Sequence, residues 1–212
     1  MGKVIVTCDS TCDLTPELYQ KYDIHVAPLY IRVGDGEYRD GVTIDTETLF
    51  RKVQETGELP KTAAVSVDDY VNLWKPFVEQ GCEVVHINIS SHFSACYQNA
   101  CAAAEELGHV YPVDSLNLSS GSGHLAIEAA LLAQEGRSGA EIQAILDEKK
   151  QRLNVSFVLD TMEYLAKGGR CSSVVAFAAG LLKLRLCIEV KDGKMDVHRK
   201  YRGKMNAVLC EY

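Results

Sequence analysis

The sequence contains no long apolar run. The longest apolar stretches of the 212-residue chain, such as 174–182, stop well short of the ~18 to 20 residues that a membrane-spanning helix needs. Before Thr7 the chain carries only about four apolar residues, whereas the apolar core of a secretory signal has ~7 to 15. We therefore expect a cytoplasmic protein with no membrane-spanning segment.

The sequence also lacks an excess of positive charge and any pair of cysteines with the two-residue gap of zinc knuckles. Lysine and arginine number 22 against 29 aspartates and glutamates, so the formal net charge of −7 argues against nucleic-acid binding. The eight cysteines are scattered. Cys8 and Cys12 are the one close pair, and no histidine lies near them in the sequence. We expect reduced thiols, no metal site and no cofactor.

Strands and helices alternate over the first 153 residues. Apolar runs predict strands, and apolar residues at helical spacing predict helices. The predicted strands cover 3–8, 24–33, 83–89 and 109–113. The first predicted helix begins at 16, and the others cover 45–56, 68–80, 93–107, 123–134 and 140–153. This alternation indicates an α/β fold whose mostly parallel sheet is covered by helices on both faces.

The pattern changes after Leu153. A strand over 155–159, a short helix over 162–166, a tight turn over 167–170 and an apolar helix over 173–182 are predicted. A hairpin follows, with strands 184–190 and 195–200 around an Asp-Gly turn. We place a domain boundary near Asn154, between an N-terminal α/β domain (1–153) and a partial second α/β domain (154–212), which is short for a core of its own.

The most informative segment for function is 87–100, where a buried strand leads into a helix through Ser91, Ser94 and Ala95. Serine hydroxyls and unpaired backbone N–H groups should then meet at the carboxyl edge of the sheet, where open α/β sheets bind ligands. Such a site suits one carboxylate or phosphate. The alternative is that Ser90 or Ser91 only caps the helix. A second hydroxyl-bearing loop, 60–66, contains Thr62, and Asp9-Ser10 and Asp114-Ser115 follow two further strands.

Other segments support other chemistries less well. Ser94, His92 and Asp114 could form a hydrolase triad, but the Gly-x-Ser-x-Gly elbow is missing. Gly121-Ser122-Gly123 fits part of a dinucleotide motif, but it does not follow a strand directly, so a helix-start or packing role is favoured. His86 lies inside a predicted strand and is interpreted as a hydrogen-bonded core residue.

Two basic features occur late in the chain. The turn 167–170 brings glycine backbone and the Arg170 guanidinium together, which would suit an anion or simply a surface turn. The run from His198 to Lys204 is either a solvated hairpin edge or a docking patch for an acidic partner.

Taken together, several segments resemble the DegV family of bacterial fatty-acid-binding proteins, in order along nearly the whole chain. The matching segments are Asp9-Ser10 with Asp13-Leu14, Val26-Ala27-Pro28-Leu29, Tyr38-Arg39-Asp40-Gly41, Pro60-Lys61-Thr62, residues 90–100, Asp114-Ser115, Gly121-Ser122-Gly123 and residues 163–170. One of these segments alone would mean little, but their order and spacing are specific.

The resemblance implies a two-domain α/β protein that buries one long-chain fatty acid between its domains. It places the carboxylate-binding residues at Thr62 and Ser94. From the helix start and the local charge we add Ser91, the backbone N–H of Ala95 and Arg170 as further ligand contacts. The resemblance also implies a carrier without catalytic residues, which presents the fatty acid to an ATP-dependent fatty-acid kinase that makes an acyl-phosphate. Arg202 and Lys204 are the candidates for docking that kinase.

The sequence departs from the family pattern in three places. Thr62-Ala63-Ala64-Val65-Ser66 replaces Thr-Ser-Gln-Pro-Ser, and Ser94-Ala95-Cys96-Tyr97 replaces Ser-Gly-Thr-Tyr. Family members are longer, so we expect the C-terminal portion of the second domain to be missing. Two alternatives stay open: a serine-dependent hydrolase or transferase that uses Ser94, and a regulatory module without a ligand.

Overall fold

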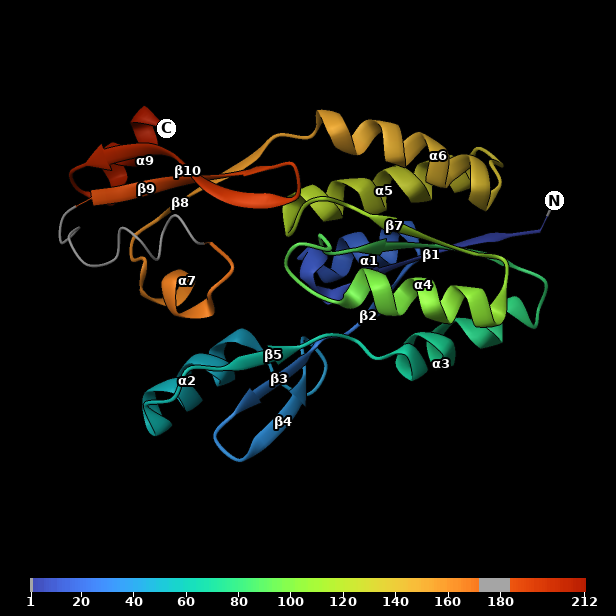
Figure 1. The fold of residues 1–212 in the computed structure, drawn as a ribbon, viewed down its shortest axis with the longest axis horizontal. Coiled ribbons are helices and arrows are strands. Elements are labelled where there is room, and N and C mark those ends of the chain that lie inside the picture. The colour runs from blue at the N-terminus through green and yellow to red at the C-terminus, as the bar shows by residue number, and fades with distance from the viewer. Residues whose placement is uncertain (1, 172–183) are drawn as a thin grey trace. The chain divides into compact units, whose positions relative to one another are not determined.

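The computed structural model describes residues 2–171 and 184–212 of the chain, which divide into two compact units, 1–153 and 154–212 (Figure 1). The helix predicted over 173–182 lies outside the described residues.

No helix among the described residues is long and apolar enough to cross a membrane.

The first unit is built on a parallel sheet of four strands in the order β2-β1-β6-β7. The strands are β1 (Val4–Asp9), β2 (Ile24–Ala27), β6 (Glu83–Asn88) and β7 (Val110–Asp114). The two central strands, β1 and β6, are buried from their second residue onward, as their apolar sequences require. The predicted α/β class with a parallel sheet is confirmed.

Helices cover both faces of this sheet (Figure 1). One face carries α1 (Pro16–Tyr22), α5 (Ser120–Gln134) and α6 (Gly139–Lys149), and the other carries α3 (Val67–Val78) and α4 (Cys96–Leu107). The core beneath α5 and α6 contains Val85, Ile87, Leu125, Ile142 and Leu146. Helix α6 ends in the short 3-10 helix η2 (Lys150–Arg152), slightly before the predicted end of that helix.

The predicted strand 24–33 is wrong as a single element, because it breaks at Pro28 into β2 and β3 (Tyr30–Val33). Proline has no backbone N–H for a sheet ladder, and the N–H of Leu29 donates to the Ser10 hydroxyl instead, at 3.2 Å. Strand β3 joins a separate antiparallel sheet in the order β4-β3-β5, which sequence analysis missed. Its partners are β4 (Gly36–Arg39) and β5 (Lys61–Ala63), and α2 (Thr46–Thr56) packs against it.

The helix predicted over 93–107 begins later, at Cys96. Residues 89–95 form a separate turn, in which the N–H groups of Phe93 and Ser94 donate to the carbonyl oxygen of Ser90 at 2.9 and 3.3 Å. Phe93 is buried although it lies outside the helix. The apolar side chain of Phe93 therefore fits the helical spacing without belonging to the helix. Ser94 likewise lies in the turn before α4, not on the helix.

Capping residues explain where the neighbouring helices begin and end. Asp45 accepts the N–H of Thr48 at 2.7 Å at the start of α2, and Gly57 ends that helix with a positive φ of 69°. Ser66 and Asp69 form a capping box at the start of α3. This box begins α3 one residue before the predicted start.

The described residues of the second unit form a three-stranded antiparallel sheet in the order β10-β9-β8 and two short helices. Its elements are β8 (Val155–Leu159), α7 (Glu163–Gly168), β9 (Leu184–Lys191), β10 (Lys194–Arg202) and α9 (Met205–Glu211). The predicted hairpin is confirmed, and Asp192 and Gly193 turn it with φ values of 50° and 77°. Helix α9 was not predicted; its Val208 packs with Cys187 and Tyr201.

Close packing at Gly123 yields a stability prediction. A methyl group at this position in α5 would lie 2.6 Å from the carbonyl oxygen of Cys12 and 2.8 Å from Leu14 Cδ2. We expect Gly123→Ala to lower the free energy of unfolding by about 1–3 kcal/mol despite the better helix propensity of alanine. Urea denaturation would measure it. The control is Gly168→Ala, where the added methyl group meets open space; equal stability of the two variants would contradict the prediction.

Candidate functional site

Loops from the carboxyl ends of three parallel strands meet at one edge of the sheet. The N–H of Ser90, after β6, donates to the carbonyl oxygen of Asn117, after β7, at 2.8 Å. The N–H of Ser119 donates to the carbonyl oxygen of Thr11, after β1, at 2.8 Å. The expected convergence of these polar loops is therefore present in the structure, and it occurs at the edge where open α/β sheets bind ligands.

The last residue of β1, Asp9, has a fully buried side chain that is surrounded by donors. Tyr70 Oη and His86 Nε2 lie 2.6 and 3.1 Å from Oδ1. The N–H of Ile89 and Nδ2 of Asn88 lie 2.9 and 3.3 Å from Oδ2. Burial of a carboxylate is very unfavourable unless it is hydrogen-bonded, so these four contacts fix α3 and the end of β6 against β1.

His86 is a core residue, as its position in a strand predicted. The indole N–H of Trp74 donates to Thr7 Oγ1 at 3.1 Å, and Thr7 Oγ1 lies 2.7 Å from His86 Nδ1. The Thr7 hydroxyl can therefore give its own proton to Nδ1, which leaves the Nε2 proton for Asp9. This assignment of the tautomer follows from the hydrogen-bond network and accounts for every polar atom of the imidazole.

The structure places the three predicted residues of the turn in different roles. The N–H of Ser91 donates to Asp114 Oδ1 at 3.1 Å. Ser94 is half-buried, and its hydroxyl oxygen accepts the N–H of Cys96 at 3.3 Å. Ala95 is exposed at the N-cap of α4, where no side chain caps the helix. The alternative that Ser90 or Ser91 caps this helix is therefore wrong, and Ser94 is the hydroxyl nearest to the helix start.

Thr62 is exposed in the middle of β5, paired with Ile31. Three residues later, the carbonyl oxygen of Val65 accepts a hydrogen bond from Asn99 Nδ2 in α4, at 2.8 Å. Three residues of chain span at most about 10 Å, so this bond keeps the Thr62 segment beside the first turns of α4. The two hydroxyl-bearing segments that the sequence singled out are thus connected through α4.

A compact polar cluster anchors the segment that carries Thr62. Asp69 accepts hydrogen bonds from Ser66 Oγ at 2.6 Å, Arg39 Nη2 at 2.7 Å and Tyr30 Oη at 2.8 Å. The Arg39 guanidinium also lies 3.9 Å from the centre of the Tyr30 ring. Burial alone would raise the pKa of Asp69, but the hydrogen bonds from Ser66, Arg39 and Tyr30 lower it to about 2.

Three predicted contact residues belong to the second unit. Arg170 is exposed, and its Nη1 donates to the carbonyl oxygen of Gly168 at 2.6 Å, next to the tight turn at Gly169. Arg202 is the exposed last residue of β10, and Lys204 is the exposed N-cap of α9. Arg202 and Lys204 thus lie two residues apart in sequence, on either side of Gly203.

The residues considered for a hydrolase triad, a dinucleotide motif or a metal site make contacts that do not suit those chemistries. Asp114 Oδ1 accepts the N–H groups of Ser91 and Leu116, both at 3.1 Å, and His92 is exposed. Gly121 and Gly123 lie buried inside α5, which agrees with a packing role and removes the dinucleotide interpretation. Among the described residues, no three His, Cys, Asp or Glu side chains are grouped to hold a metal ion.

Two features of this edge were not predicted from the sequence. The loop between β7 and α5 contains two non-glycine residues with positive φ, Leu116 at 51° and Ser119 at 50°, a strain that often accompanies functional loops. Ser10 donates to Asp40 Oδ2 at 2.7 Å and thereby joins the parallel sheet to the turn after β4. No local sequence signal predicts either feature, because both depend on contacts between distant segments.

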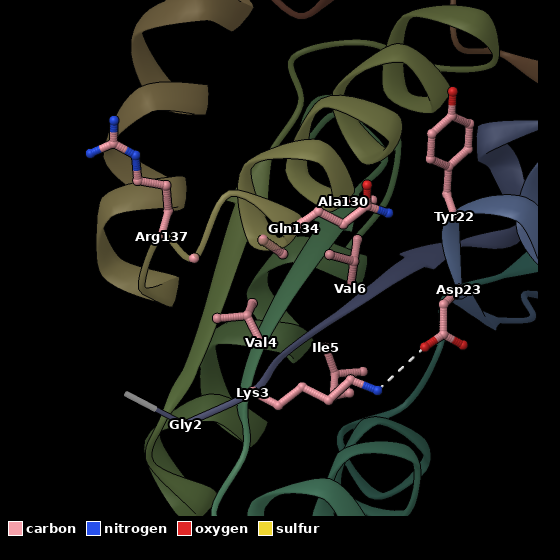
Figure 2. Close-up of a pocket in the computed structure, with 12 residues that line it drawn as sticks. Gly2, Lys3, Val4, Ile5, Val6, Tyr22, Asp23, Ala130, Gln134 and Arg137 are labelled. Carbon is pink, nitrogen blue, oxygen red and sulfur yellow. Dashed lines mark hydrogen bonds and ion pairs between the residues drawn. The ribbon is translucent and has the colours of Figure 1, made fainter.

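A cavity of about 510 Å³ lies at the opposite end of the sheet, around the amino end of β1 (Figure 2). Its walls come from residues 2–6, the end of α1 and the end of α5. Its charged groups are paired, since Lys3 Nζ lies 3.5 Å from Asp23 and Arg137 Nη1 lies 3.6 Å from Glu141. None of the predicted ligand contacts lines it, and ligands of open α/β sheets bind at the other end of the strands.

Comparison with known proteins gives consistent matches over almost the whole chain. The family model that matches, over residues 3–209, is described as "Uncharacterised protein, DegV family". A DegV domain-containing protein of Clostridium perfringens is 33% identical over 210 residues, which cover 98% of this chain and 75% of that protein. A "Fatty acid-binding protein" of Thermotoga maritima is 32% identical over 215 residues, which cover 97% and 74%.

Two solved structures illustrate the similarity of the fold. A fatty-acid-binding DegV family protein from Thermus thermophilus matches with a TM-score of 0.88 and 31% identity, and the match covers 97% of this chain and 74% of that one. A stearic-acid-binding protein from Eubacterium ventriosum matches with a TM-score of 0.86 and 29% identity, covering 100% and 75%.

The cluster around Asp69 predicts a specific dependence of stability on pH. Folding lowers the pKa of Asp69 from 3.8 to about 2. Ionised Asp69 therefore adds to the free energy of unfolding above pH 4, and this stabilisation is lost as the pH falls through 2. Between pH 5 and pH 2 the wild-type protein should lose about 2 kcal/mol more unfolding free energy than Asp69→Asn. Urea denaturation at both pH values measures this difference. Asp68→Asn, which removes an exposed charge one residue away, is the control and should behave as wild type.

Proposed function

The chain belongs to the DegV family, and we propose that it binds a long-chain fatty acid whose carboxylate is held by Thr62 and Ser94. The observation that carries this proposal is the position of the Ser94 hydroxyl directly before α4, on a turn that follows β6 at the carboxyl edge of the sheet. Relatives described as fatty-acid-binding proteins support the choice of ligand.

The chemistry of this edge suits a single carboxylate. Ser94 and Thr62 each offer a hydroxyl proton, and the exposed Ala95 lies at the N-cap, where the backbone N–H groups of a helix carry partial positive charge. The N–H of Ser91 is already used by Asp114, so we assign the hydroxyl of Ser91 to the ligand instead. Neutral donors can stabilise the carboxylate without an ion pair.

The acyl chain would supply most of the binding free energy. Each buried methylene group contributes about 0.8 kcal/mol, so a sixteen-carbon tail offers a gross ~10 kcal/mol before the entropic costs of binding. The hydroxyls of Thr62 and Ser94 then determine which end of the ligand enters this site. They also limit the desolvation penalty of the carboxylate, which would cost several kcal/mol without hydrogen bonds.

A carrier role fits the surroundings of Ser94 better than catalysis. The hydroxyl of Ser94 donates to the sulfur of Cys96 at 3.1 Å, whereas a nucleophilic serine needs a general base such as an imidazole. In this proposal the protein presents the bound fatty acid to an ATP-dependent fatty-acid kinase, which forms the acyl-phosphate. Arg170 would contact the ligand or its phosphate, and Arg202 and Lys204 would dock the kinase through their exposed positive charges.

The ligand site is tested by Thr62→Val combined with Ser94→Ala. Loss of two hydrogen bonds to a buried carboxylate should weaken fatty-acid binding by about 3 kcal/mol or more. Binding is measured by titration with a sixteen-carbon fatty acid, and lipid extracted from the denatured protein is identified by mass spectrometry. Thr46→Val with Ser156→Ala, two exposed positions elsewhere, is the control. Unchanged affinity of the test variant would refute the site, and labelling of Ser94 by an activated phosphonate would favour the hydrolase.

The docking surface is tested by charge reversal. Arg202→Glu with Lys204→Glu should lower the rate of kinase-dependent phosphorylation of bound fatty acid, because an acidic partner would now be repelled. Fatty-acid affinity should stay at the wild-type value. Lys194→Glu, at the opposite end of β10, is the matched control for a change of charge on the same strand. A phosphorylation rate equal to that of wild type would exclude this docking surface.

A further inference from the structure

The hydroxyl of Ser94 makes two hydrogen bonds to one residue, Cys96. Its oxygen accepts the backbone N–H of Cys96 at 3.3 Å, and its proton is donated to Cys96 Sγ at 3.1 Å. The side chain of Cys96 is fully buried at the start of α4. Two bonds to the same rigid residue limit the rotation of the Ser94 side chain, so the position of its oxygen depends directly on Cys96.

Cys96 is in turn connected to the buried network around Asp9. Its thiol contacts the hydroxyl of Tyr70 and the backbone N–H of Val65. Tyr70 Oη lies 2.6 Å from Asp9 Oδ1, and a carboxylate can only accept hydrogen bonds. The single proton of the Tyr70 hydroxyl therefore points at Asp9, and the oxygen of that hydroxyl accepts a hydrogen bond from Nδ2 of Asn88 at 3.1 Å and lies beside the Cys96 thiol.

The sulfur of Cys96 accepts the proton of Ser94 at 3.1 Å. The thiol keeps its proton at neutral pH, because burial and the nearby Asp9 charge raise the pKa of Cys96 to about 11. Two neutral groups, the thiol of Cys96 and the hydroxyl of Tyr70, thus lie between the half-buried hydroxyl of Ser94 and the buried carboxylate of Asp9.

We propose that Cys96 is a positioning residue for the fatty-acid carboxylate, because it joins the hydroxyl of Ser94 to the network of Asp9. This inference rests on the proposed function. Without ligand, the sulfur holds the Ser94 proton beside the helix start. When a carboxylate arrives, the proton turns from the sulfur to a carboxylate oxygen. Sulfur is a weak hydrogen-bond acceptor, so breaking the bond from Ser94 to Cys96 costs little free energy.

The binding experiment uses three variants of the full chain and a sixteen-carbon fatty acid. Cys96→Ala removes both hydrogen-bonding functions of the thiol and should weaken binding about fivefold. Cys96→Ser keeps a donor and an acceptor at the same place and should restore binding to within about twofold of wild type. Cys101→Ala, also on α4 and half-buried, is the matched control and should bind as wild type.

Combining Cys96→Ala with Ser94→Ala distinguishes positioning of the Ser94 hydroxyl from a general effect of Cys96 on the fold. If Cys96 acts through Ser94, then Cys96→Ala should cause no further loss of affinity when Ser94 is already alanine. The same fivefold loss in both backgrounds would overturn the proposal, because Cys96 would then only support the fold. Wild-type affinity of Cys96→Ala would overturn it as well.

Infrared spectroscopy of the thiol tests the bond without changing Cys96. The S–H stretching band of Cys96 is the band that Cys96→Ala removes from the spectrum. Ser94→Ala should shift this band in the absence of ligand, and saturation of the wild type with fatty acid should shift it in the same direction. If the wild type binds no fatty acid, the proposed function fails while the shift in Ser94→Ala still tests the bond. An unchanged band in Ser94→Ala would refute the bond itself.

Discussion

The buried carboxylate of Asp9 is the constraint on which the first unit depends. A charged group without solvent is tolerated only when hydrogen bonds replace its water shell, and removal of such partners leaves a penalty of several kcal/mol. Its four donors come from α3, from β6 and from the turn that follows β6. These donors lie 61 to 80 residues away from Asp9 in sequence, so a single acidic side chain makes the docking of this segment against β1 a condition of folding.

The same network gives the proposed ligand site its rigidity. Tyr70 contacts both Asp9 and Cys96, and Cys96 holds Ser94. On the other side, Asn99 ties Val65, and with it the strand of Thr62, to α4. The negative charge of Asp9 therefore lies near a site proposed for an anion. The hydroxyl of Tyr70 and the thiol of Cys96, both neutral, separate Asp9 from that site. Such an arrangement favours recognition of a carboxylate by orientation, while apolar burial supplies the affinity.

Basic side chains are concentrated in one hairpin of the second unit. The whole chain is acidic, with a net charge of −7, yet β10 and the residue that caps α9 carry a dense set of basic side chains. The β-bulge between Val197 and Arg199 changes the alternation of side chains along this strand. In the proposed function, this basic hairpin recognises a partner protein, whereas the hydroxyls of the first unit recognise the lipid.

Local sequence determined most of the elements, because apolar runs, capping residues and the Asp-Gly turn act over only a few residues. Strands β1, β6 and β7, helix α2 and the hairpin of the second unit were predicted on that basis, and the family resemblance singled out Ser94 and Thr62. Tertiary structure decided the rest. It paired the N–H of Leu29, after the break at Pro28, with Ser10, and it joined the turn before α4 to the carbonyl oxygen of Asn117. It also closed the hydrogen bonds around Asp9, whose donors lie 61 to 80 residues away, and local sequence cannot specify contacts between segments so far apart.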